Sequence, residues 1–583
     1  MDRILKRSPI LILGLAIGLA LIFAACTATT TPPVGPTGSP TQTQSITPIS
    51  VASTETPPLA LATPTPYSDQ GQPSTESSNP PLMPAATPAP GTVAYSLAER
   101  AGAGGAAAAP PFPFSTGGTA TVNDDPYDST FFKNYGVNPF IDTEDDFFST
   151  FAMDVDTAAY TVARRFVSDG YLPDPDSIRV EEFINYFKQD YEPPTEDVFA
   201  IHIEGAPSAF GTEKHWLMRV GLQGKMIDSE ERDDASLVFV IDVSGSMARE
   251  NRLGLVKNAL GMLVEELRQD DMVGIVIYGS TANVLLEPTA GNNQGAIMEA
   301  IGSLEPGGST NAAHGLRLGY QMADGLTGPG RTTRVVLLSD GVANVGNTGS
   351  NSILNDVRRY VDQGIQLSTI GFGMGNYNDI LMEQLANDGD GNYAYVDTIS
   401  QARRVFVENL TGMLQVIAKD AKVQVEFNPG VVSRYRLIGY ENRRVADEDF
   451  RVDTVDAGEV GAGHAVTALY ELKFHEDASG QMAKVFLRYE DPRTGEVTEI
   501  EKGFDKSQLM TSVEQASARF QLDAAVAEYA EILRDSYWAL DGNLKDVRAL
   551  TQRVSSMLPN DPDVAEFAML VTRAMQIEEG DVS

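Results

Sequence analysis

The sequence has very few of the residues from which most enzymes build a reactive site. Its 583 residues include one cysteine, Cys26, and five scattered histidines. A single cysteine excludes an intramolecular disulfide, and His475-Glu476 is not followed by a second histidine at zinc-binding spacing. The glycine-rich phosphate-binding motif and the serine motif of hydrolases are also absent. We therefore predict no catalytic or cofactor-binding residues and a protein that is not an enzyme.

Positive charge is also scarce. The chain has 43 Lys and Arg residues against 80 Asp and Glu residues, so its net charge is −37. A body this acidic repels nucleic acid and anionic lipid headgroups, and we expect no nucleic-acid partner. The same charge would concentrate divalent cations near the surface, although solubility is the simpler explanation for it.

One apolar run ends in a cluster of oxygen donors. The segment 237–241 reads Leu-Val-Phe-Val-Ile, without alternation, which is typical of a strand buried on both faces of a parallel sheet. Asp242, Ser244 and Ser246 follow it on one short loop. A carboxylate and two hydroxyls are hard ligands that suit Mg²⁺, whereas the competing interpretation is that these residues cap a helix.

Two later loops favour the metal interpretation. Thr310 ends the loop Pro306-Gly-Gly-Ser-Thr before a helical stretch, and Asp340 ends a second buried strand that begins at Arg334. In an open α/β sheet, ligands bind outside the carboxyl ends of the strands, where all three loops would lie. We therefore predict a metal site made by Asp242, Ser244, Ser246, Thr310 and Asp340.

Residues 236–417 resemble a von Willebrand factor type A domain. The pattern Asp-x-Ser-x-Ser, then Thr, then Asp-Gly is that of its metal-ion-dependent adhesion site, and all five positions are present. The resemblance implies a doubly wound, mostly parallel α/β sheet, a bound Mg²⁺ (or Mn²⁺ or Ca²⁺), and a protein partner whose Asp or Glu carboxylate completes the coordination. Five residues are candidates for the rim of the site: Met247, Asn311, His314, Val342 and Asn344.

The N-terminus has the features of a secretory signal. Arg3, Lys6 and Arg7 precede the apolar run 10–25, which is short for a membrane span. The run ends in Phe-Ala-Ala-Cys26, which resembles a bacterial lipobox. That resemblance implies cleavage after residue 25, lipidation of Cys26, and attachment to the outer face of a cell membrane; an uncleaved signal anchor is the alternative. Residues 26–120 hold 18 of the 33 prolines and are predicted to be a disordered tether.

The hydrophobic patterns of residues 121–583 predict four regions. We predict an N-terminal region of helices and then strands over 121–236, the α/β domain over 237–417, a β-rich domain over 420–505 and a helical segment over 506–583. Helices are expected near 156–166, 178–187 and 399–417. The strand 272–278 should turn back as an antiparallel edge hairpin. We also expect the strands in 198–223 to pair with those in 420–505, which makes the α/β domain an insertion in a β-sandwich.

Three further motifs have a structural interpretation beside a functional one. Asp154 and Asp156 could hold a metal but are better interpreted as a helix cap, and the segment 387–392 is a turn rather than a calcium loop. Thr511 and Glu514 read as a capping box.

The whole arrangement resembles bacterial YfbK-like lipoproteins. The segments 149–160 and 179–187 carry that likeness, together with the type A domain. We favour an extracytoplasmic, membrane-anchored protein-binding module of the adhesion type. A scaffold of an envelope complex with a mainly structural metal is the alternative, and an adaptor for a cytoplasmic ATPase conflicts with the secretory signal. The helix expected at 399–417 could couple the metal site to the β-rich domain.

Overall fold

The computed structural model describes residues 132–583, apart from 212–213, 342–349, 374–376 and 581–583. The predicted signal, the lipidation site Cys26 and the tether therefore lie outside the described residues, as do Val342 and Asn344. Within the part of the chain that is described, none of the helices is both long enough and apolar enough to cross a membrane.

A six-stranded sheet forms the α/β part of the protein. Its strand order is β10-β9-β8-β5-β6-β7, and every neighbouring pair is parallel except β6 and β7. The strands are β5 (Asp234–Asp242), β6 (Met272–Tyr278), β7 (Ala282–Ala290), β8 (Arg331–Ser339), β9 (Ile365–Phe372) and β10 (Tyr393–Val396). The predicted antiparallel hairpin at the sheet edge is thus confirmed.

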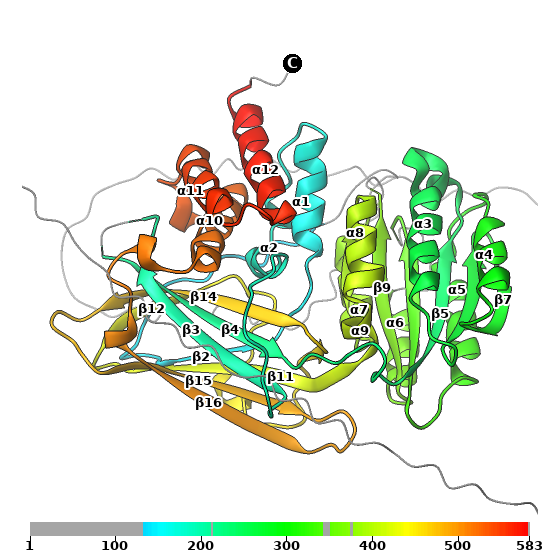
Figure 1. Ribbon diagram of the computed structural model, residues 1–583, viewed down its shortest axis with the longest axis horizontal. Helices are drawn as coiled ribbons and strands as arrows, with labels where there is room; N and C mark the ends of the chain where they lie inside the picture. The colour runs from blue at the N-terminus through cyan, green and yellow to red at the C-terminus, as the bar shows by residue number, and fades with distance from the viewer. Residues whose placement is uncertain (1–131, 212–213, 342–349, 374–376, 581–583) are drawn as a thin grey trace, which may run out of the picture. The chain divides into compact units, whose positions relative to one another are not determined.

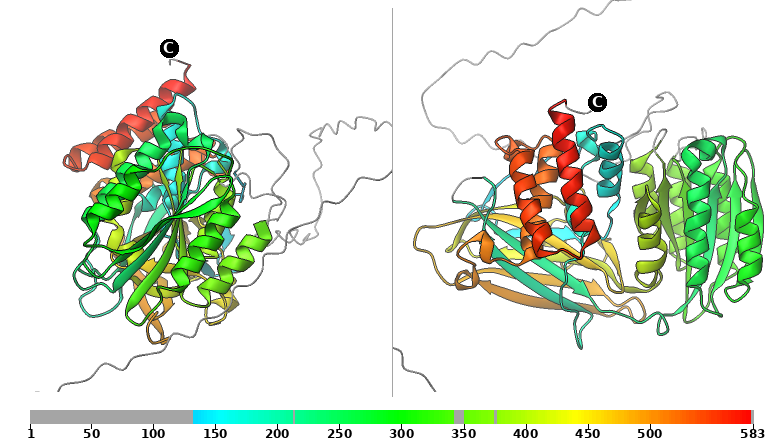
Figure 2. Two further views of the ribbon diagram at one scale, coloured as in Figure 1. Left: turned by 90° about the vertical axis from the view of Figure 1, so that its right-hand side faces the viewer. Right: turned by 45° about the horizontal axis from the view of Figure 1, so that its top comes forward.

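Helices cover both faces of this sheet (Figure 1; Figure 2, left). They are η2 (Gly245–Asn251), α3 (Arg252–Glu265), α4 (Gln294–Gly302), α5 (Ala312–Asp324), α6 (Ser350–Val361), α7 (Asp379–Asn387), α8 (Ile399–Arg403), η3 (Arg404–Glu408) and α9 (Leu410–Leu414). One apolar core joins α3, α4, α8 and α9 to the sheet, and a second joins α5, α6 and α7. The central strand β5 is buried from Ala235 to Asp242 because it contributes side chains to both cores. The predicted doubly wound α/β fold is confirmed.

A β-sandwich is built from segments on either side of the α/β part in the sequence. One sheet has the order β1-β12-β14-β4-β3, and the other has the order β13-β11-β15-β16 with β2 paired to β11. The strands are β1 (Ile141–Asp142), β2 (Phe148–Ala152), β3 (Phe199–Pro207), β4 (Trp216–Gly224), β11 (Val416–Phe427), β12 (Val432–Ile438), β13 (Gly458–Gly461), β14 (Ala465–Phe474), β15 (Gln481–Glu490) and β16 (Val497–Asp505). Side chains of both sheets share one apolar core.

The predicted pairing across the insertion is confirmed. Strand β4 pairs with β14 in antiparallel register, with Met218 opposite Tyr470. Alternation along the strands then directs Tyr470 and Met218 into the sandwich, whereas Leu469 and Leu217 point to the opposite face. This second face is apolar, so it needs a cover.

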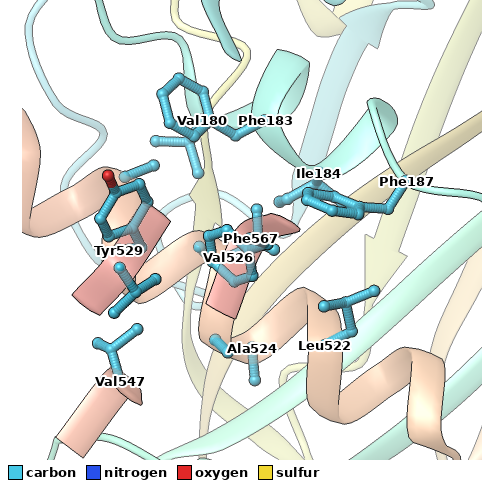
Figure 3. Packing of buried hydrophobic residues seen from close by; sticks show 14 of the residues in the cluster. Val180, Phe183, Ile184, Phe187, Leu522, Ala524, Val526, Tyr529, Val547 and Phe567 are labelled. Carbon is cyan, nitrogen blue, oxygen red and sulfur yellow. The ribbon is translucent and has the colours of Figure 1, made fainter. Parts of the chain in front are cut away.

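Helices from both ends of the described chain provide that cover. They are α1 (Ala158–Ser168), α2 (Val180–Asn185), α10 (Ala518–Leu533), α11 (Leu544–Met557) and α12 (Pro562–Glu578). Figure 3 shows Phe183 of α2 and Phe187, which follows α2, packed with Tyr529 of α10 and Phe567 of α12. Short helical turns connect the layers: η1 (Pro175–Ser177), η4 (Asp447–Asp449), η5 (Lys506–Gln508), η6 (Val513–Gln515) and η7 (Tyr537–Ala539). The residues that we assigned to separate N-terminal, β-rich and helical segments are therefore interleaved in space.

The single helix predicted over 399–417 is wrong in detail. The segment is divided into α8, a π-helical turn (η3) and α9, and it ends at Leu414. Strand β11 begins at Val416, six residues before the predicted start at 422, because the backbone of this segment pairs with β13. Ala462 N–H also donates to the Gln415 carbonyl at 2.8 Å, which ends the helix.

Two predicted helix caps are also wrong, and one start is confirmed. Asp156 does not cap α1. It accepts hydrogen bonds from the Tyr393 N–H at 2.9 Å and from the Arg443 guanidinium at 3.3 Å, because its side chain is buried against the α/β part. Thr511 bonds to the Gln515 side chain instead of capping a helix, and Ser517 caps α10. Asp561 caps α12 with Pro562 in the first turn, as expected from the sequence.

Candidate functional site

The site lies where the chain reverses direction through the α/β sheet. From β5 the chain proceeds to β6 and β7 on one side, and it then returns to β8 on the other side of β5. The carboxyl ends of β5 and β8 therefore flank the switch point, the usual ligand position in an open α/β sheet. Asp242 is the last residue of β5, and Asp340 follows the last residue of β8.

Asp242 is fully buried, and within the described part of the chain it accepts hydrogen bonds from neutral donors. Its Oδ1 accepts from the Ser244 N–H at 2.7 Å, and its Oδ2 accepts from the Ser339 hydroxyl at 3.0 Å. Burial, followed by the charge of Asp340, raises the pKa of Asp242 to about 6, against the opposing effect of these hydrogen bonds. Asp242 therefore pays a desolvation penalty that a bound cation would relieve.

A chain of hydrogen bonds joins three more of the predicted ligands. The hydroxyls of Ser244 and Ser246 are 2.9 Å apart, and the Ser246 hydroxyl donates to Asp340 Oδ1 at 3.0 Å. The Ser244 and Asp340 residues are almost completely buried. The structure thus brings Asp242, Ser244, Ser246 and Asp340 together, and their oxygens are of the hard type that Mg²⁺ prefers.

The fifth predicted ligand, Thr310, stands on an adjacent loop. Gly307 N–H donates to the Val243 carbonyl at 2.6 Å, and Gly245 N–H donates to the Gly308 carbonyl at 3.1 Å, so this loop is bonded to the Asp242 loop. Gly308 has a φ of +89°, and a Cβ there would lie 2.9 Å from the Ser280 hydroxyl. This close approach requires glycine, and it holds the loop that carries the half-buried Thr310 against the Asp242 loop.

The rim residues have different roles from the one predicted for them. Met247 is fully buried in the core, and Asn311 caps α5 by accepting from the His314 N–H at 3.2 Å. The exposed His314 ring accepts from the Ala282 N–H through Nδ1 at 3.4 Å. Two of the five rim candidates therefore serve the fold, and His314 remains accessible beside the site.

The other motifs do not assemble into metal sites. Asp154 and Asp156 both pair with Arg443, and Asp390 lies at a left-handed turn and pairs with Lys419 at 3.0 Å. Within the described ranges, no group of three or more His, Cys, Asp or Glu residues is arranged to hold a metal ion. The predicted site does not conflict with this, because it combines two carboxylates with three hydroxyls.

Sequence reasoning missed one residue at this site. Arg252, the first residue of α3, donates from Nη1 to Asp340 Oδ2 at 2.7 Å, and both side chains are 4% exposed. The sequence offered a weak indication of it, since a basic residue near the N-terminus of a helix opposes the helix dipole and needs a separate reason. Only the folded structure places that guanidinium against the predicted ligand.

Comparison with known protein families gives three matches. The family model of the von Willebrand factor type A domain matches residues 236–409, which include all five predicted ligands. A second model, described as von Willebrand factor, matches residues 126–219. The model described as uncharacterized protein YfbK, C-terminal, matches residues 412–577, which span the later sandwich strands and most of the C-terminal helices.

Similar proteins include bacterial and animal sequences. Inter-alpha-trypsin inhibitor heavy chain H3 of Homo sapiens is 27% identical over 263 residues, which cover 41% of this chain and 29% of that protein. Among solved structures, the von Willebrand factor type A protein from Catenulispora acidiphila is 15% identical and covers 64% of this chain and 89% of its own, with a TM-score of 0.39, too low to support a conclusion.

A bacterial relative is similar over most of the chain. The uncharacterized protein YfbK of Escherichia coli (strain K12) is 35% identical over 470 residues, which cover 76% of this chain and 80% of the relative. The matched stretch is long enough to include the α/β part together with most of the surrounding sandwich and helices. The protein belongs to the YfbK family and carries a von Willebrand factor type A domain.

Proposed function

We propose that this protein is a metal-dependent protein-binding module of the cell envelope. A divalent cation, Mg²⁺ or Mn²⁺, would be held by Asp242, Ser244, Ser246, Thr310 and Asp340, and a carboxylate of a partner protein would complete its coordination. Ca²⁺, which takes more oxygen ligands, is the less suitable ion for this set. The observation that carries the proposal is the convergence of Asp242, Ser244, Ser246 and Asp340 at the sheet's switch point.

The donor set fits such a cation. Two carboxylates and three hydroxyls are all hard oxygen ligands. Mg²⁺ binds about six such ligands, and it usually keeps several water molecules among them. The buried Asp242 carboxylate gains no charged partner from the protein among the described residues, so a cation is the missing element. When bound, the cation supplies a Lewis-acidic position for an incoming oxygen ligand.

Binding rather than catalysis is the role that these residues support. Within the described residues, the Ser244 hydroxyl bonds to the Ser246 hydroxyl, and the hydrogen bonds of the site join serines, carboxylates and Arg252 without a histidine base. A nucleophilic serine needs an adjacent base that is oriented by a third group. We therefore propose that the site recognises a ligand and does not transform it.

The membrane attachment is a second part of the proposal. The Phe-Ala-Ala-Cys26 sequence is the basis for lipidation, and two acyl chains would suffice for stable anchoring at the outer face of the membrane. A Cys26→Ser variant of the full-length protein should then appear in the soluble fraction, without the mass of the lipid, while the wild type remains with the membranes. Equal fractionation of both proteins would refute the anchor.

Metal binding is tested by titration of the purified residues 121–583 with Mg²⁺ and Mn²⁺ in a calorimeter. Wild type should bind one ion, and Asp242→Ala should bind none. Asp324→Ala, which removes the same charge from an exposed position at the end of α5, is the matched control and should bind as wild type does. Unchanged binding in Asp242→Ala would overturn the assignment.

Partner capture is tested with the same proteins on a resin and an envelope extract. A partner that uses the metal should bind wild type and Asp324→Ala in Mg²⁺, and it should be lost in EDTA and with Asp242→Ala. A partner retained in EDTA would support instead the scaffold role with a mainly structural metal. The two roles are therefore separated by one comparison.

A further inference from the structure

Arg252 is placed beside the metal site by unusual local structure. Glu250 and Asn251, the two residues before it, have φ values of +50° and +58°, in the left-handed region that non-glycine residues rarely adopt. Gly373, directly after β9, has a φ of +84°, and a Cβ there would lie 2.2 Å from Arg252 Nε. The fold thus accepts strain on one side of Arg252 and omits a side chain on the other.

The helix does not explain this arrangement. Arg252 begins α3, where the helix dipole disfavours a positive charge, and a buried guanidinium loses its hydration. What it gains is Asp340, whose Oδ2 accepts from Arg252 while Oδ1 accepts from Ser246. The two oxygens of one carboxylate are therefore divided between a permanent cation and the predicted metal ligands.

This division sets the charge of the site. The carboxylates of Asp242 and Asp340 contribute two negative charges, and the Arg252 guanidinium contributes one positive charge; the half-exposed Glu250, whose Oε2 lies 3.9 Å from Arg252 Nη2, is the same in every variant and is left out of this count. The metal-free site is therefore −1, and a divalent cation would bring it to +1. Without Arg252 the same site would change from −2 to 0, and it would have no net attraction for an anion.

We propose that Arg252 is a specificity-determining residue that weakens metal binding and strengthens the capture of a carboxylate by the loaded site. The inference rests on the proposed function, since it assumes that a divalent cation binds at Asp242 and Asp340. It assigns to one buried guanidinium two opposite effects, and a residue that only supports the fold would not produce both.

The experiment uses Mn²⁺ as the metal and acetate as the anionic probe. Arg252→Gln and Arg252→Met remove the charge, and Arg252→Lys retains it. Lys257→Gln, which removes a positive charge from the same helix where Lys257 bonds to the Gly302 carbonyl, is the matched control. Mn²⁺ affinity is measured by electron paramagnetic resonance, and acetate capture by the relaxation that bound Mn²⁺ causes in the acetate methyl protons.

The neutral variants should bind Mn²⁺ about 25-fold more tightly than wild type and acetate about fivefold more weakly. Fivefold is the factor for one pair of unit charges at about 4 Å in the dielectric of water, and the divalent ion counts as two such pairs. Arg252→Lys and Lys257→Gln should stay within about twofold of wild type in both measurements. Circular dichroism verifies folding, and the second neutral variant is used if the first does not fold.

Three results would overturn the proposal. Equal Mn²⁺ affinity in wild type and a folded neutral variant, or weaker binding of both Mn²⁺ and acetate, would show that Arg252 only positions Asp340. Absence of Mn²⁺ binding in wild type itself would overturn the proposed function together with this inference. If wild type bound Mn²⁺ but not acetate, the carboxylate partner would be refuted, and unequal Mn²⁺ affinities would still support the charge effect on the metal.

Discussion

Two regions that bury carboxylates give them different partners. At the junction of the α/β part with α1 and α2, three of them pair with arginine: Arg179 pairs with Glu182 and with Asp379 at 2.8 Å, and Arg164 pairs with Asp397 at 2.6 Å, whereas the neighbouring Glu181 accepts from the Tyr440 N–H at 3.0 Å. At the sheet's switch point, Asp242 is equally buried, and its hydrogen bonds within the described part of the chain come from the neutral donors of Ser244 and Ser339. Asp242 therefore differs from the arginine-paired carboxylates in the charge of its partners and not in its burial.

The difference contrasts carboxylates paired with arginine with a carboxylate of the proposed metal site. A buried ion pair that loses one member leaves the other uncompensated, so the junction arginines hold the parts of the chain together. Asp242 already lacks such a partner, and its raised pKa is the physical sign of that deficit. The predictions below remove one group at a time to test whether the two regions respond in opposite directions.

The largest loss of stability is expected at the junction of the α/β part with α1 and α2. Arg179→Met should lower the free energy of unfolding by about 3–5 kcal/mol, because Glu182 and Asp379 would stay buried without their cation. Lys188→Met is the control, since the Lys188 side chain is 68% exposed and its ion pair with Glu408 should contribute only about 0–1 kcal/mol. Urea unfolding in EDTA measures both, and a loss below 1 kcal/mol for Arg179→Met would contradict the comparison.

At the switch point, removal of a charged group is expected to increase stability. Asp242→Asn should raise the free energy of unfolding of the metal-free protein by about 1–3 kcal/mol, because it removes a buried charge whose pKa is displaced to about 6. Mg²⁺ at one hundred times its dissociation constant should stabilise wild type by about 2.7 kcal/mol and leave the variant unchanged. The measurement is urea unfolding with and without Mg²⁺, with Asp324→Asn as the control. A variant less stable than wild type in EDTA would break the comparison.

A third carboxylate tests the same rule away from both regions. Glu528 of α10 lines a cavity of about 600 Å³, and burial, followed by the charges of Glu531 and Glu471, raises its pKa to about 7. Between pH 4.5 and 7 the folded protein therefore holds a proton that the unfolded chain has lost, so stability should fall as pH rises through this window.

Glu528→Gln should remove this part of the pH dependence. We expect the variant to exceed wild type by about 1–2 kcal/mol at pH 7 and to match it near pH 4.5. Glu514→Gln at the exposed rim of the same cavity is the matched control and should run parallel to wild type between pH 4.5 and 7, because the pKa of Glu514 is lowered and it stays ionised over this range. Parallel curves for wild type and Glu528→Gln would refute the assignment.

The sequence predicted those features that one short segment determines by itself. The apolar run into Asp242, the hairpin after β6 and the Asp561-Pro562 helix start each carry their structure locally, and all three are found. It failed where a distant segment competes. Asp156 bonds to Arg443 instead of capping its helix, and residues 416–417, predicted as the end of a helix, belong to β11, which pairs with β13. Arg252 was missed for the same reason, because only the fold brings it to Asp340.

The smallest effect is expected for coupling between the metal site and the β-sandwich. In the middle of α9, a Cβ on Gly412 would lie 2.6 Å from His464 Nε2 and 2.9 Å from the Ala462 carbonyl, so α9 lies directly against the sandwich. Upstream, the π-helical turn Arg404–Glu408 borders a cleft of about 830 Å³, which leaves room for that turn to move while α9 stays fixed.

We therefore expect that α9 is fixed rigidly to the sandwich and that the π-helical turn before it can deform. Gly412→Ala should cost about 1–3 kcal/mol of stability through overpacking, because the new methyl forces α9 away from β13. If the turn absorbs this displacement, the affinity of the site for Mn²⁺ should change by less than about twofold. A change of about fivefold or more, the lower end of ordinary allosteric coupling, would show instead that α9 transmits between the sandwich and the metal site. Gly302→Ala, at the end of α4, where an added methyl meets open space, is the control for a glycine substitution without contact.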